Sequence, residues 1–268
     1  MGKYDKIILL SDIDGTLLNS QSRVGEKNRQ AISEFIKEGG SFGIATGRSL
    51  TNARSLLENT EINGYCILAN GSLLYDYRKN KYIDEISLNK AEIIKFLEKC
   101  MEERKNTDIQ IYTRDLSYMI TPREFADPQV IKDHIPIEFA SVQQIWNMSW
   151  TKILFSGNPD EIKWIKENSE YLESSHTVSR VQSAEKYYEF LPAGSSKGEM
   201  LERLKMHLEK DQTVYAVGDY YNDVEMLRNA DVGIAVFNAP DEVKEYADIV
   251  CKSCNEDAIA DVIENIIR

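Results

Sequence analysis

Short apolar runs and helix-spaced apolar residues alternate over the first seventy residues of the chain. Residues 6–12 form an apolar run that ends in acidic and glycine residues, which is typical of a buried parallel strand that opens into a loop. A helix is predicted next from apolar residues at helical spacing: Ala31, Ile32, Phe35 and Ile36. Strands at 42–45 and 65–69, with a helix at 52–57 between them, complete an alternation that is typical of parallel sheets.

The pattern changes after residue 71. Apolar residues at 73–77 and 82–86 flank a polar turn at 78–81, which predicts a β-hairpin. Further elements are predicted as strands at 108–112, 117–121 and 152–155 and as helices at 93–100 and 161–170. Here strands neighbour strands, and all three tryptophans lie in this stretch. The order of elements predicts an inserted α+β module with a small core of its own.

Strand and helix alternate again from residue 187. The predicted elements are strands at 187–190, 213–217 and 232–235, helices at 197–208 and from 222, and a last amphipathic helix at 259–266. We therefore predict an α/β fold. Its Rossmann-like, doubly wound parallel-sheet core comprises residues 1–80 and 188–268, and residues 81–187 form an inserted α+β cap domain.

Composition narrows the class of protein. A chain of 268 residues is long enough for one large domain or two modest ones, each with an apolar interior. The 44 acidic residues outnumber the 32 basic ones, and the net charge of −12 argues against nucleic acid as a partner. The cysteines show no disulfide framework and favour a reducing compartment: Cys66, Cys100, Cys251 and Cys254. The apolar run at 7–10 is too short for a signal peptide or a membrane span, so we expect a cytoplasmic protein with no membrane partner.

Several polar residues follow the predicted strands of the core. Ligands of open parallel sheets bind beyond the carboxyl ends of the strands. The candidates in this position are Asp12, Asp14, Thr46, Asp219, Asn222 and Asp223. Lys197 starts a helix whose first turn points to the same edge of the sheet. The convergence of these groups predicts a binding or catalytic site there.

Asp12 and Asp14 are suited to nucleophilic and acid–base chemistry. Asp12 would attack phosphorus, because the acyl phosphate that it forms is labile enough to be hydrolysed. Asp14 would protonate the departing oxygen and later take a proton from water. Gly15 would let the backbone turn so that amide N–H groups face the phosphate oxygens. An Asp-Gly turn after a strand is also common without any function, so this pair alone leaves both interpretations open.

Thr46 and Lys197 are suited to bind a phosphate. The Thr46 hydroxyl would donate to a phosphate oxygen, although a threonine in front of a helix is as readily an N-cap. A lysine near a helix start is most often solvated surface. The helix dipole disfavours a cation in the first turn, however, and the position of Lys197 therefore indicates a compensating negative charge nearby.

Asp219 is suited to bind Mg²⁺, together with one oxygen of Asp12 and the backbone carbonyl of Asp14. Mg²⁺ prefers such all-oxygen ligands when a phosphate and water complete its shell. Asn222 and Asp223 would support the metal, its waters or the lysine. Helix capping is the alternative for Asn222 or Asp223, but one cap would not require both Asp219 and Asp223.

Four motifs, in their order and spacing, resemble those of the haloacid dehalogenase superfamily of phosphatases: DIDGT at 12–16, TGR at 46–48, KG at 197–198 and GDYYND at 218–223. The large insertion before the third motif and the Asn-Gly pair at 70–71 are similar to the Cof-type branch, whose cap is of type IIB. The resemblance implies Asp12 as nucleophile and Asp14 as acid/base. The implied phosphate-binding residues are Thr46, Gly47, Lys197 and Asn222. The implied metal-site residues are Asp12, Asp14, Asp219 and Asp223, and Arg48 and Asn70 are candidate substrate contacts.

The sequence thus predicts a Mg²⁺-dependent phosphatase that hydrolyses a small phosphorylated metabolite through an aspartyl-phosphate intermediate. The resemblance favours a sugar phosphate or a phosphorylated cofactor as the substrate. A sugar phosphomutase of the same superfamily would share every core residue and is one alternative. A non-catalytic phosphate-sensing module is the other. We expect a monomer or a weak homo-oligomer.

Overall fold

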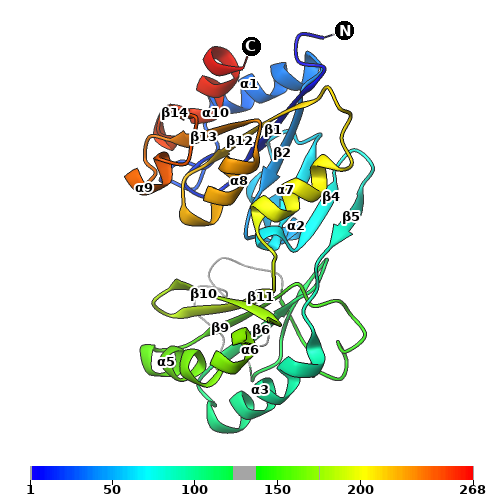
Figure 1. The fold of residues 1–268 in the computed structure, drawn as a ribbon, viewed down its shortest axis with the longest axis vertical. Coiled ribbons are helices and arrows are strands. Elements are labelled where there is room, and N and C mark those ends of the chain that lie inside the picture. The colour runs from blue at the N-terminus through cyan, green and yellow to red at the C-terminus, as the bar shows by residue number, and fades with distance from the viewer. Residues whose placement is uncertain (1, 123–136, 175, 268) are drawn as a thin grey trace. The chain divides into compact units, whose positions relative to one another are not determined.

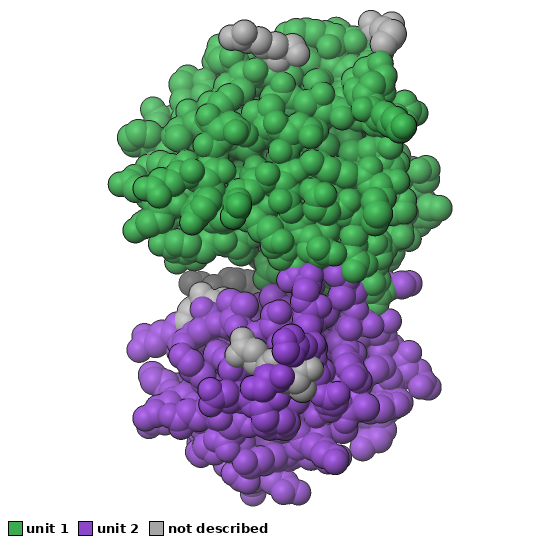
Figure 2. All heavy atoms as spheres, viewed as in Figure 1, with its two compact units in different colours: residues 1–48, 53–85, 196–268 green, residues 49–52, 86–195 purple. Residues whose placement is uncertain are grey.

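The computed structural model describes residues 2–122, 137–174 and 176–267, and the chain divides into two compact units (Figure 2). Unit 1 comprises residues 1–48, 53–85 and 196–268, and unit 2 comprises residues 49–52 and 86–195. Unit 1 therefore joins the two ends of the chain, and most of unit 2 is inserted between them.

Unit 1 is built on an eight-stranded sheet with the order β14-β13-β12-β1-β2-β3-β4-β5 (Figure 1). Its strands are β1 (Ile7–Ser11), β2 (Ser41–Ala45), β3 (Tyr65–Leu68), β4 (Leu73–Asp76), β5 (Lys81–Glu85), β12 (Thr213–Gly218), β13 (Val232–Val236) and β14 (Ile249–Cys251). The strands from β14 to β3 are parallel, and β4 and β5 add an antiparallel hairpin. The predicted α/β class with a parallel core is confirmed.

Helices cover this sheet, with α1 packed against α10 and α7 packed against α8 (Figure 1). The helices are α1 (Glu26–Lys37), α2 (Leu50–Leu56), α7 (Lys197–Lys205), α8 (Val224–Asn229), α9 (Asp241–Lys244) and α10 (Ala258–Asp261), and a π-helical turn follows at Val262–Ile266. The start of α2 is grouped with unit 2. Within the described part of the chain, no helix has the length and apolar character needed to cross a membrane.

The direction of winding reverses between β1 and β12. From β1 the chain proceeds through β2 to β3 on one side, and from β12 it proceeds through β13 to β14 on the other. Ile8, Leu9 and Leu10 of β1 are completely buried, as expected for a central strand with helices on both faces of its sheet. In open α/β sheets, ligands bind at such a reversal point, beyond the carboxyl ends of the strands.

Unit 2 contains a six-stranded sheet with the order β10-β11-β9-β6-β7-β8. Its elements are β6 (Asp108–Tyr112), β7 (Ser117–Met119), β8 (Ile137–Phe139), β9 (Lys152–Ser156), β10 (Val178–Ala184), β11 (Tyr187–Pro192), α3 (Lys90–Glu103), α5 (Pro159–Asn168) and α6 (Glu170–Ser174). Apolar side chains of this sheet, of α3, of α5 and of the segment before β9 form one buried cluster, which includes Phe96, Ile109, Ile111, Trp150, Ile153, Phe155 and Ile162. Unit 2 therefore has a hydrophobic core of its own.

The boundaries between the units differ from the predicted ones at 80/81 and 187/188. β5 belongs to the sheet of unit 1, because the hairpin register joins it to β4 along its length. β11 was predicted as a strand of the core, but it lies between β9 and β10 in the sheet of unit 2. An apolar run has the same pattern in either sheet, so the pattern identified β11 as a strand without identifying its partners.

Some short elements were not predicted. These are β8, β10, β14 and α9. β8, β14 and α9 contain only three or four residues, too few for a periodic pattern, and β10 is mostly polar. The single helix predicted at 161–170 is instead two helices, α5 and α6, which meet at Ser169.

Gly71 occupies a position where a side chain does not fit. Its φ is +92°, and a Cβ at this position would lie 1.9 Å from the carbonyl oxygen of Ser196. We predict that Gly71→Ala lowers the free energy of unfolding by about 2–4 kcal/mol, because the positive φ is unfavourable for alanine and the two backbones must also move apart.

Gly194→Ala is the matched control for this change. Gly194 also has a positive φ, +75°, but nothing lies within 4 Å of its Cβ position. Its substitution should therefore cost only about 1 kcal/mol. Urea unfolding of the whole chain, followed for both variants, measures the two losses. Equal losses would contradict the steric contact with Ser196.

Candidate active site

Asp12 and Asp219 follow two neighbouring parallel strands at the reversal point of the sheet. In the register of β1 and β12, Ser11 is opposite Val217, and the Asp12 N–H donates to the Val217 carbonyl at 2.9 Å. Asp12 is buried, with an exposed fraction of 5%, and Asp219 is partly buried. The pairing of β1 with β12 thus brings together two carboxylates from opposite ends of the chain.

Lys197 places a buried ammonium between two carboxylates. Its Nζ donates to Asp12 Oδ1 at 2.7 Å and to Asp223 Oδ1 at 2.6 Å, and the side chains of Lys197 and Asp223 are 0% exposed. Lys197 is the first residue of α7, and the N-cap Ser196 accepts a hydrogen bond from the Glu199 N–H at 2.9 Å. A cation at this position opposes the helix dipole at a cost of about 0.3–1 kcal/mol. Two charge-assisted hydrogen bonds offset that cost.

Asp223 is held at both of its carboxylate oxygens. Oδ1 accepts from Lys197, and Oδ2 accepts from the backbone N–H groups of Asp219, at 3.0 Å, and Tyr220, at 3.1 Å. The side chain therefore accepts from backbone donors that precede it, in a capping box with Tyr220, and binds the ammonium as well, but it does not cap α8. Asp223 couples the turn after β12 to the first residue of α7.

Burial and neighbouring charges shift the pKa values of this group. Burial raises the pKa of Asp12 well above its ordinary value of 3.8; the Lys197 charge opposes this shift, and the Asp223 charge adds to it. Burial, again with the Asp223 charge, raises the pKa of Asp219 to about 6. Burial would lower the pKa of Lys197, but the charges of Asp12 and Asp223 raise it above its ordinary value. The lysine therefore stays charged. Its single positive charge does not cancel the effect of burial on the pKa values of Asp12 and Asp219.

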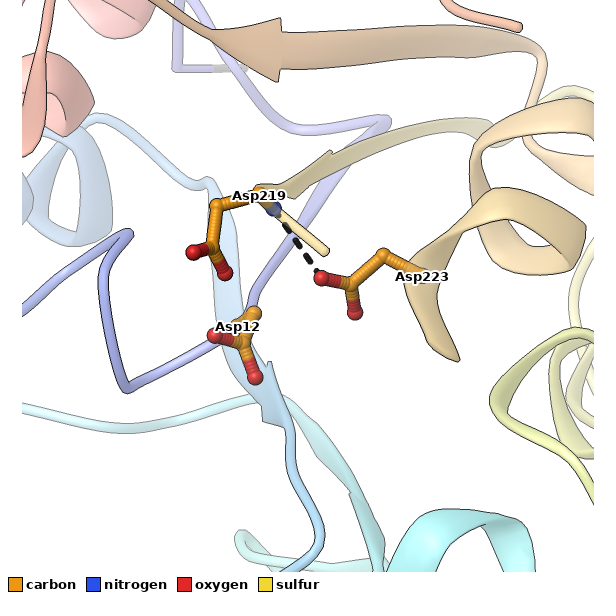
Figure 3. A group of neighbouring side chains, drawn as sticks. All are labelled: Asp12, Asp219 and Asp223. Carbon is orange, nitrogen blue, oxygen red and sulfur yellow. Dashed lines mark hydrogen bonds between the residues drawn. The ribbon is translucent and has the colours of Figure 1, made fainter. Parts of the chain in front are cut away.

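The three carboxylates form a group that suits a divalent cation (Figure 3). One oxygen from each of Asp12, Asp219 and Asp223 lies within 4.8 Å of the others. Three ionised carboxylates and one ammonium give a charge of −3 + 1 = −2, which a divalent cation would neutralise. Asp223 already uses both oxygens in hydrogen bonds to Lys197 and the backbone, whereas the carboxyl groups of Asp12 and Asp219 lie close enough to each other to share a proton. This oxygen donor set fits a hard ion such as Mg²⁺.

Asp14 directs its carboxylate to Arg48 and not to this acidic group. Arg48 donates from Nε to Asp14 Oδ2 at 2.7 Å and from Nη2 to Asp14 Oδ1 at 2.8 Å. The two side chains are 54% and 34% exposed, and exposed ion pairs contribute about 0–1 kcal/mol. The Asp14 side chain is therefore not part of the carboxylate group, and its predicted metal contact through the backbone carbonyl stays a prediction. The same holds for a substrate contact of Arg48.

Thr46 lies directly after β2, the other neighbour of β1. It is buried, with an exposed fraction of 1%, and its Oγ1 accepts a hydrogen bond from the Arg48 N–H at 3.2 Å. This bond closes the turn through Gly47. Thr46 does not cap α2, because Ser49 precedes that helix and its Oγ accepts from the Asn52 N–H at 3.3 Å. The hydroxyl proton of Thr46 is not used in the bond from Arg48, so Thr46 keeps a donor for a phosphate oxygen.

Asn70 connects the loop after β2 with the acidic turn after β12. Its N–H donates to the Thr46 carbonyl at 3.1 Å, and its Oδ1 accepts from Asn222 Nδ2 at 3.3 Å. Asn70 and the preceding Ala69 have positive φ values of 54° and 50°. Such a conformation costs about 1–2 kcal/mol for a residue with a side chain, and it persists where surrounding contacts impose it. Asn222 thus meets Asn70 in this structure, and its predicted contact with phosphate is untested.

Two further residues contact this region and were not predicted from the sequence. Thr16 is fully buried, and its hydroxyl donates to Asp219 Oδ1 at 3.4 Å. Asn238 donates from Nδ2 to the Gly15 carbonyl at 2.8 Å. Thr16 belongs to the DIDGT motif, and its position there was an available signal. Asn238 lies just after the carboxyl end of β13, a third parallel strand of the same sheet. That position was the only signal in the sequence that could have identified it.

Comparison with known proteins adds an independent finding. A family model described as haloacid dehalogenase-like hydrolase matches residues 9–263. Over 290 residues the chain is 28% identical to the 5-amino-6-(5-phospho-D-ribitylamino)uracil phosphatase YwtE of Bacillus subtilis (strain 168), a match that covers 96% of each chain. Over 264 residues it is 27% identical to the HMP-PP phosphatase of Yersinia enterocolitica, and this match covers 95% of this chain and 93% of that protein.

A solved structure extends the comparison to the whole fold. The HAD subclass IIB sugar phosphatase BT4131 matches with a TM-score of 0.75 over 96% of this chain and 97% of that chain. The sequence identity is 22%, so this similarity shows the fold alone. The similarity extends over both units, the inserted one included.

The raised pKa values predict how the stability of the metal-free protein depends on pH. Asp12 and Asp219 bind protons more tightly in the folded chain than in the unfolded chain, where the ordinary value is 3.8. Both therefore favour folding below about pH 4. The contribution of Asp219 is lost as the pH rises through about 6, and that of Asp12 is lost as the pH rises through its own raised pKa. We predict that Asp219→Asn loses less stability than the wild type between pH 4 and pH 7.

Thermal unfolding midpoints in EDTA across this pH range test the prediction. Asp5→Asn is the control for the loss of a negative charge. Asp5 is exposed and precedes β1, whereas Asp12 follows the other end of that strand. Equal slopes in wild type and Asp219→Asn would contradict the raised pKa of Asp219.

Proposed function

The chain belongs to the haloacid dehalogenase-like hydrolases, and on this premise we propose that it is a Mg²⁺-dependent phosphatase of small phosphorylated metabolites. The observation that supports this most is the Lys197 ammonium buried between Asp12 and Asp223, with the Asp219 carboxylate beside them. The group orients one carboxylate at the end of a strand, and its charge of −2 suits a divalent cation. Both relatives named above are phosphatases.

Asp12 is the proposed nucleophile. Lys197 holds Oδ1, so Oδ2 attacks phosphorus in line with the leaving oxygen. The Oδ2–P bond forms while the bond from phosphorus to the leaving oxygen breaks. Asp14, in its acid form, gives a proton to that oxygen, and the alcohol departs neutral. The Thr46 hydroxyl and the Lys197 ammonium bind oxygens of the transferring group and keep it in line.

Asp14 then acts as the base of the second step. It takes a proton from a water molecule, whose oxygen attacks the phosphorus of the aspartyl phosphate. The Oδ2–P bond breaks, inorganic phosphate leaves, and the Asp12 carboxylate is restored. Over both steps one phosphate ester and one water become one alcohol and one phosphate, and Asp14 regains its proton.

Arg48 must release Asp14 before either proton transfer. A carboxylate that accepts a bidentate hydrogen bond from a guanidinium has both oxygens engaged. Because the pair is exposed on both sides, its opening costs only about 0–1 kcal/mol. We infer that Arg48 holds Asp14 between turnovers and yields it when substrate is bound.

Asp12, Asp219 and the backbone carbonyl of Asp14 are the proposed holders of Mg²⁺. When bound, the ion supplies positive charge that offsets the negative charge of the phosphoryl group. Asp223 contributes by positioning Lys197 and the backbone of Asp219, with both of its oxygens engaged.

Unit 2 is the proposed cap, which would contact the organic part of the substrate. The names of the two relatives specify different substrates, a phosphoribitylamino-uracil and HMP-PP, so neither transfers directly to this chain. Sugar phosphates and phosphorylated cofactors are the class to test first. The net charge of −12 makes a polyanionic substrate unfavourable.

Phosphate release from a substrate panel tests the proposed function. The panel contains sugar phosphates, pyridoxal phosphate, flavin mononucleotide and an aryl phosphate, each with Mg²⁺ and with EDTA. We expect Mg²⁺-dependent release, and in Asp12→Asn a loss of kcat/KM of more than about 10³-fold, because the amide is not a nucleophile. Asp84→Asn is the control. Asp84 lies in β5, pairs with Arg203 of α7 and is not part of the site.

Two outcomes would replace the proposal. Isomerised product that requires a bisphosphorylated activator would identify a phosphomutase. No release from any substrate, with or without such an activator, would favour the phosphate-sensing alternative. Equal activity of Asp12→Asn and wild type would exclude Asp12 as the nucleophile.

A further inference from the structure

The carboxamide of Asn238 bridges the loop after Asp12 and a segment near the C-terminus. Its Nδ2 donates to the Gly15 carbonyl at 2.8 Å, and its Oδ1 accepts from the Cys254 N–H at 2.8 Å. Both ends of the amide are engaged, so its orientation is fixed. Asn238 lies outside the four motifs, and the mechanism above does not use it.

Gly15 is the point of this loop at which the backbone can change direction most readily. Its φ is +81°, and a Cβ here would lie 2.4 Å from Asp219 Oδ2. Because glycine has no Cβ, its backbone torsions can vary over a wide range, so the direction of the Gly15 carbonyl depends on the hydrogen bond that it accepts. Among the described residues, Asn238 is the only hydrogen-bond donor to the carbonyl of this peptide.

The orientation of this peptide decides which group it offers to a ligand. The C=O and N–H of a trans peptide point in opposite directions. With the Gly15 carbonyl bound to Asn238, the Thr16 N–H points away from Asn238. That N–H meets no acceptor within the described residues, although Thr16 is fully buried. A buried donor without an acceptor is suited to an anion, and a rotation of this peptide would turn the N–H away from it.

We propose that Asn238 is a positioning residue, which holds the Gly15–Thr16 peptide with its N–H available to the phosphate of the substrate. The inference rests on the proposed function and deepens it. Asn238 itself touches neither the phosphate nor the carboxylate group. It is exposed, so its two hydrogen bonds contribute little to the stability of the fold, and its variants are expected to fold.

Two variants of Asn238 and one matched control form the test. Asn238→Asp retains the size of the side chain and an acceptor for Cys254, but replaces the donor to Gly15 by a carboxylate oxygen. Asn238→Ala removes both contacts. Asn255→Ala is the control, because exposed Asn255 also joins the C-terminal segment to the loop after Asp12, by accepting from the Ser20 N–H at 2.9 Å, without touching the Gly15–Thr16 peptide.

The measurements are kcat and KM for an aryl phosphate, the dissociation constant of inorganic phosphate at saturating Mg²⁺ by isothermal titration calorimetry, and the thermal unfolding midpoint. Both Asn238 variants should lower kcat/KM by about 10- to 100-fold, since small displacements of positioning groups have effects of this size. They should also weaken phosphate binding severalfold, with an unfolding midpoint close to that of the wild type. Asn255→Ala should match the wild type throughout.

Wild-type phosphate affinity in the Asn238 variants would overturn the inference, and so would equal losses in Asn255→Ala. A loss confined to Asn238→Ala and accompanied by a lower unfolding midpoint would show a purely structural role and overturn it as well. If the wild type binds phosphate but hydrolyses no substrate, the proposed function fails while the calorimetry still decides the role of Asn238. A wild type that neither binds phosphate nor hydrolyses any substrate overturns both.

Discussion

The buried Lys197 ammonium is the interaction on which the rest of the site depends. It bonds Asp12 at the end of β1 and Asp223 in the turn after β12, and it begins α7, so one charge fixes three segments of the chain. Loss of one partner of a buried ion pair typically costs about 3–5 kcal/mol, because the remaining charge is left uncompensated. Without the lysine, three carboxylates would lie together with no opposing charge. The same ammonium therefore stabilises the fold and, in the proposed mechanism, keeps Asp12 oriented for attack.

The site combines a rigid buried part with an exposed, adaptable one. Lys197, Asp12 and Asp223 are buried and hydrogen-bonded, as electrostatic stabilisation of a transition state requires. Asp14 and Arg48 form an exposed pair that opens at small cost, which the proposed acid/base role of Asp14 requires. The reversal of strand order between β1 and β12 brings both parts to one edge of the sheet. The buried charges and the reversal of strand order therefore occur at the same place, the carboxyl ends of β1 and β12.

Much of this arrangement could be predicted from the sequence, because strong local signals carried it. Apolar runs identified β1 and β12, and the carboxyl ends of parallel strands placed Asp12 and Asp219 together. The unfavourable position of Lys197 in a helix dipole indicated negative charge nearby, which the structure provides. Other contacts between distant residues left no such signal. The sheet to which β11 belongs and the bond from Asn238 to the Gly15 carbonyl depend on three-dimensional packing and on no local pattern.

The central claim is that Asp12 forms a covalent bond to phosphorus, and chemical trapping of that bond tests it most directly. Asp14→Asn would be mixed with a ³²P-labelled aryl phosphate, whose leaving group departs without an acid, and quenched in acid within milliseconds. The account predicts label in the peptide that contains Asp12, released by hydroxylamine and absent when Asp12 is also replaced by Asn. Release of phosphate in a single turnover with no labelled protein at any time would contradict it, and would assign the attack to water.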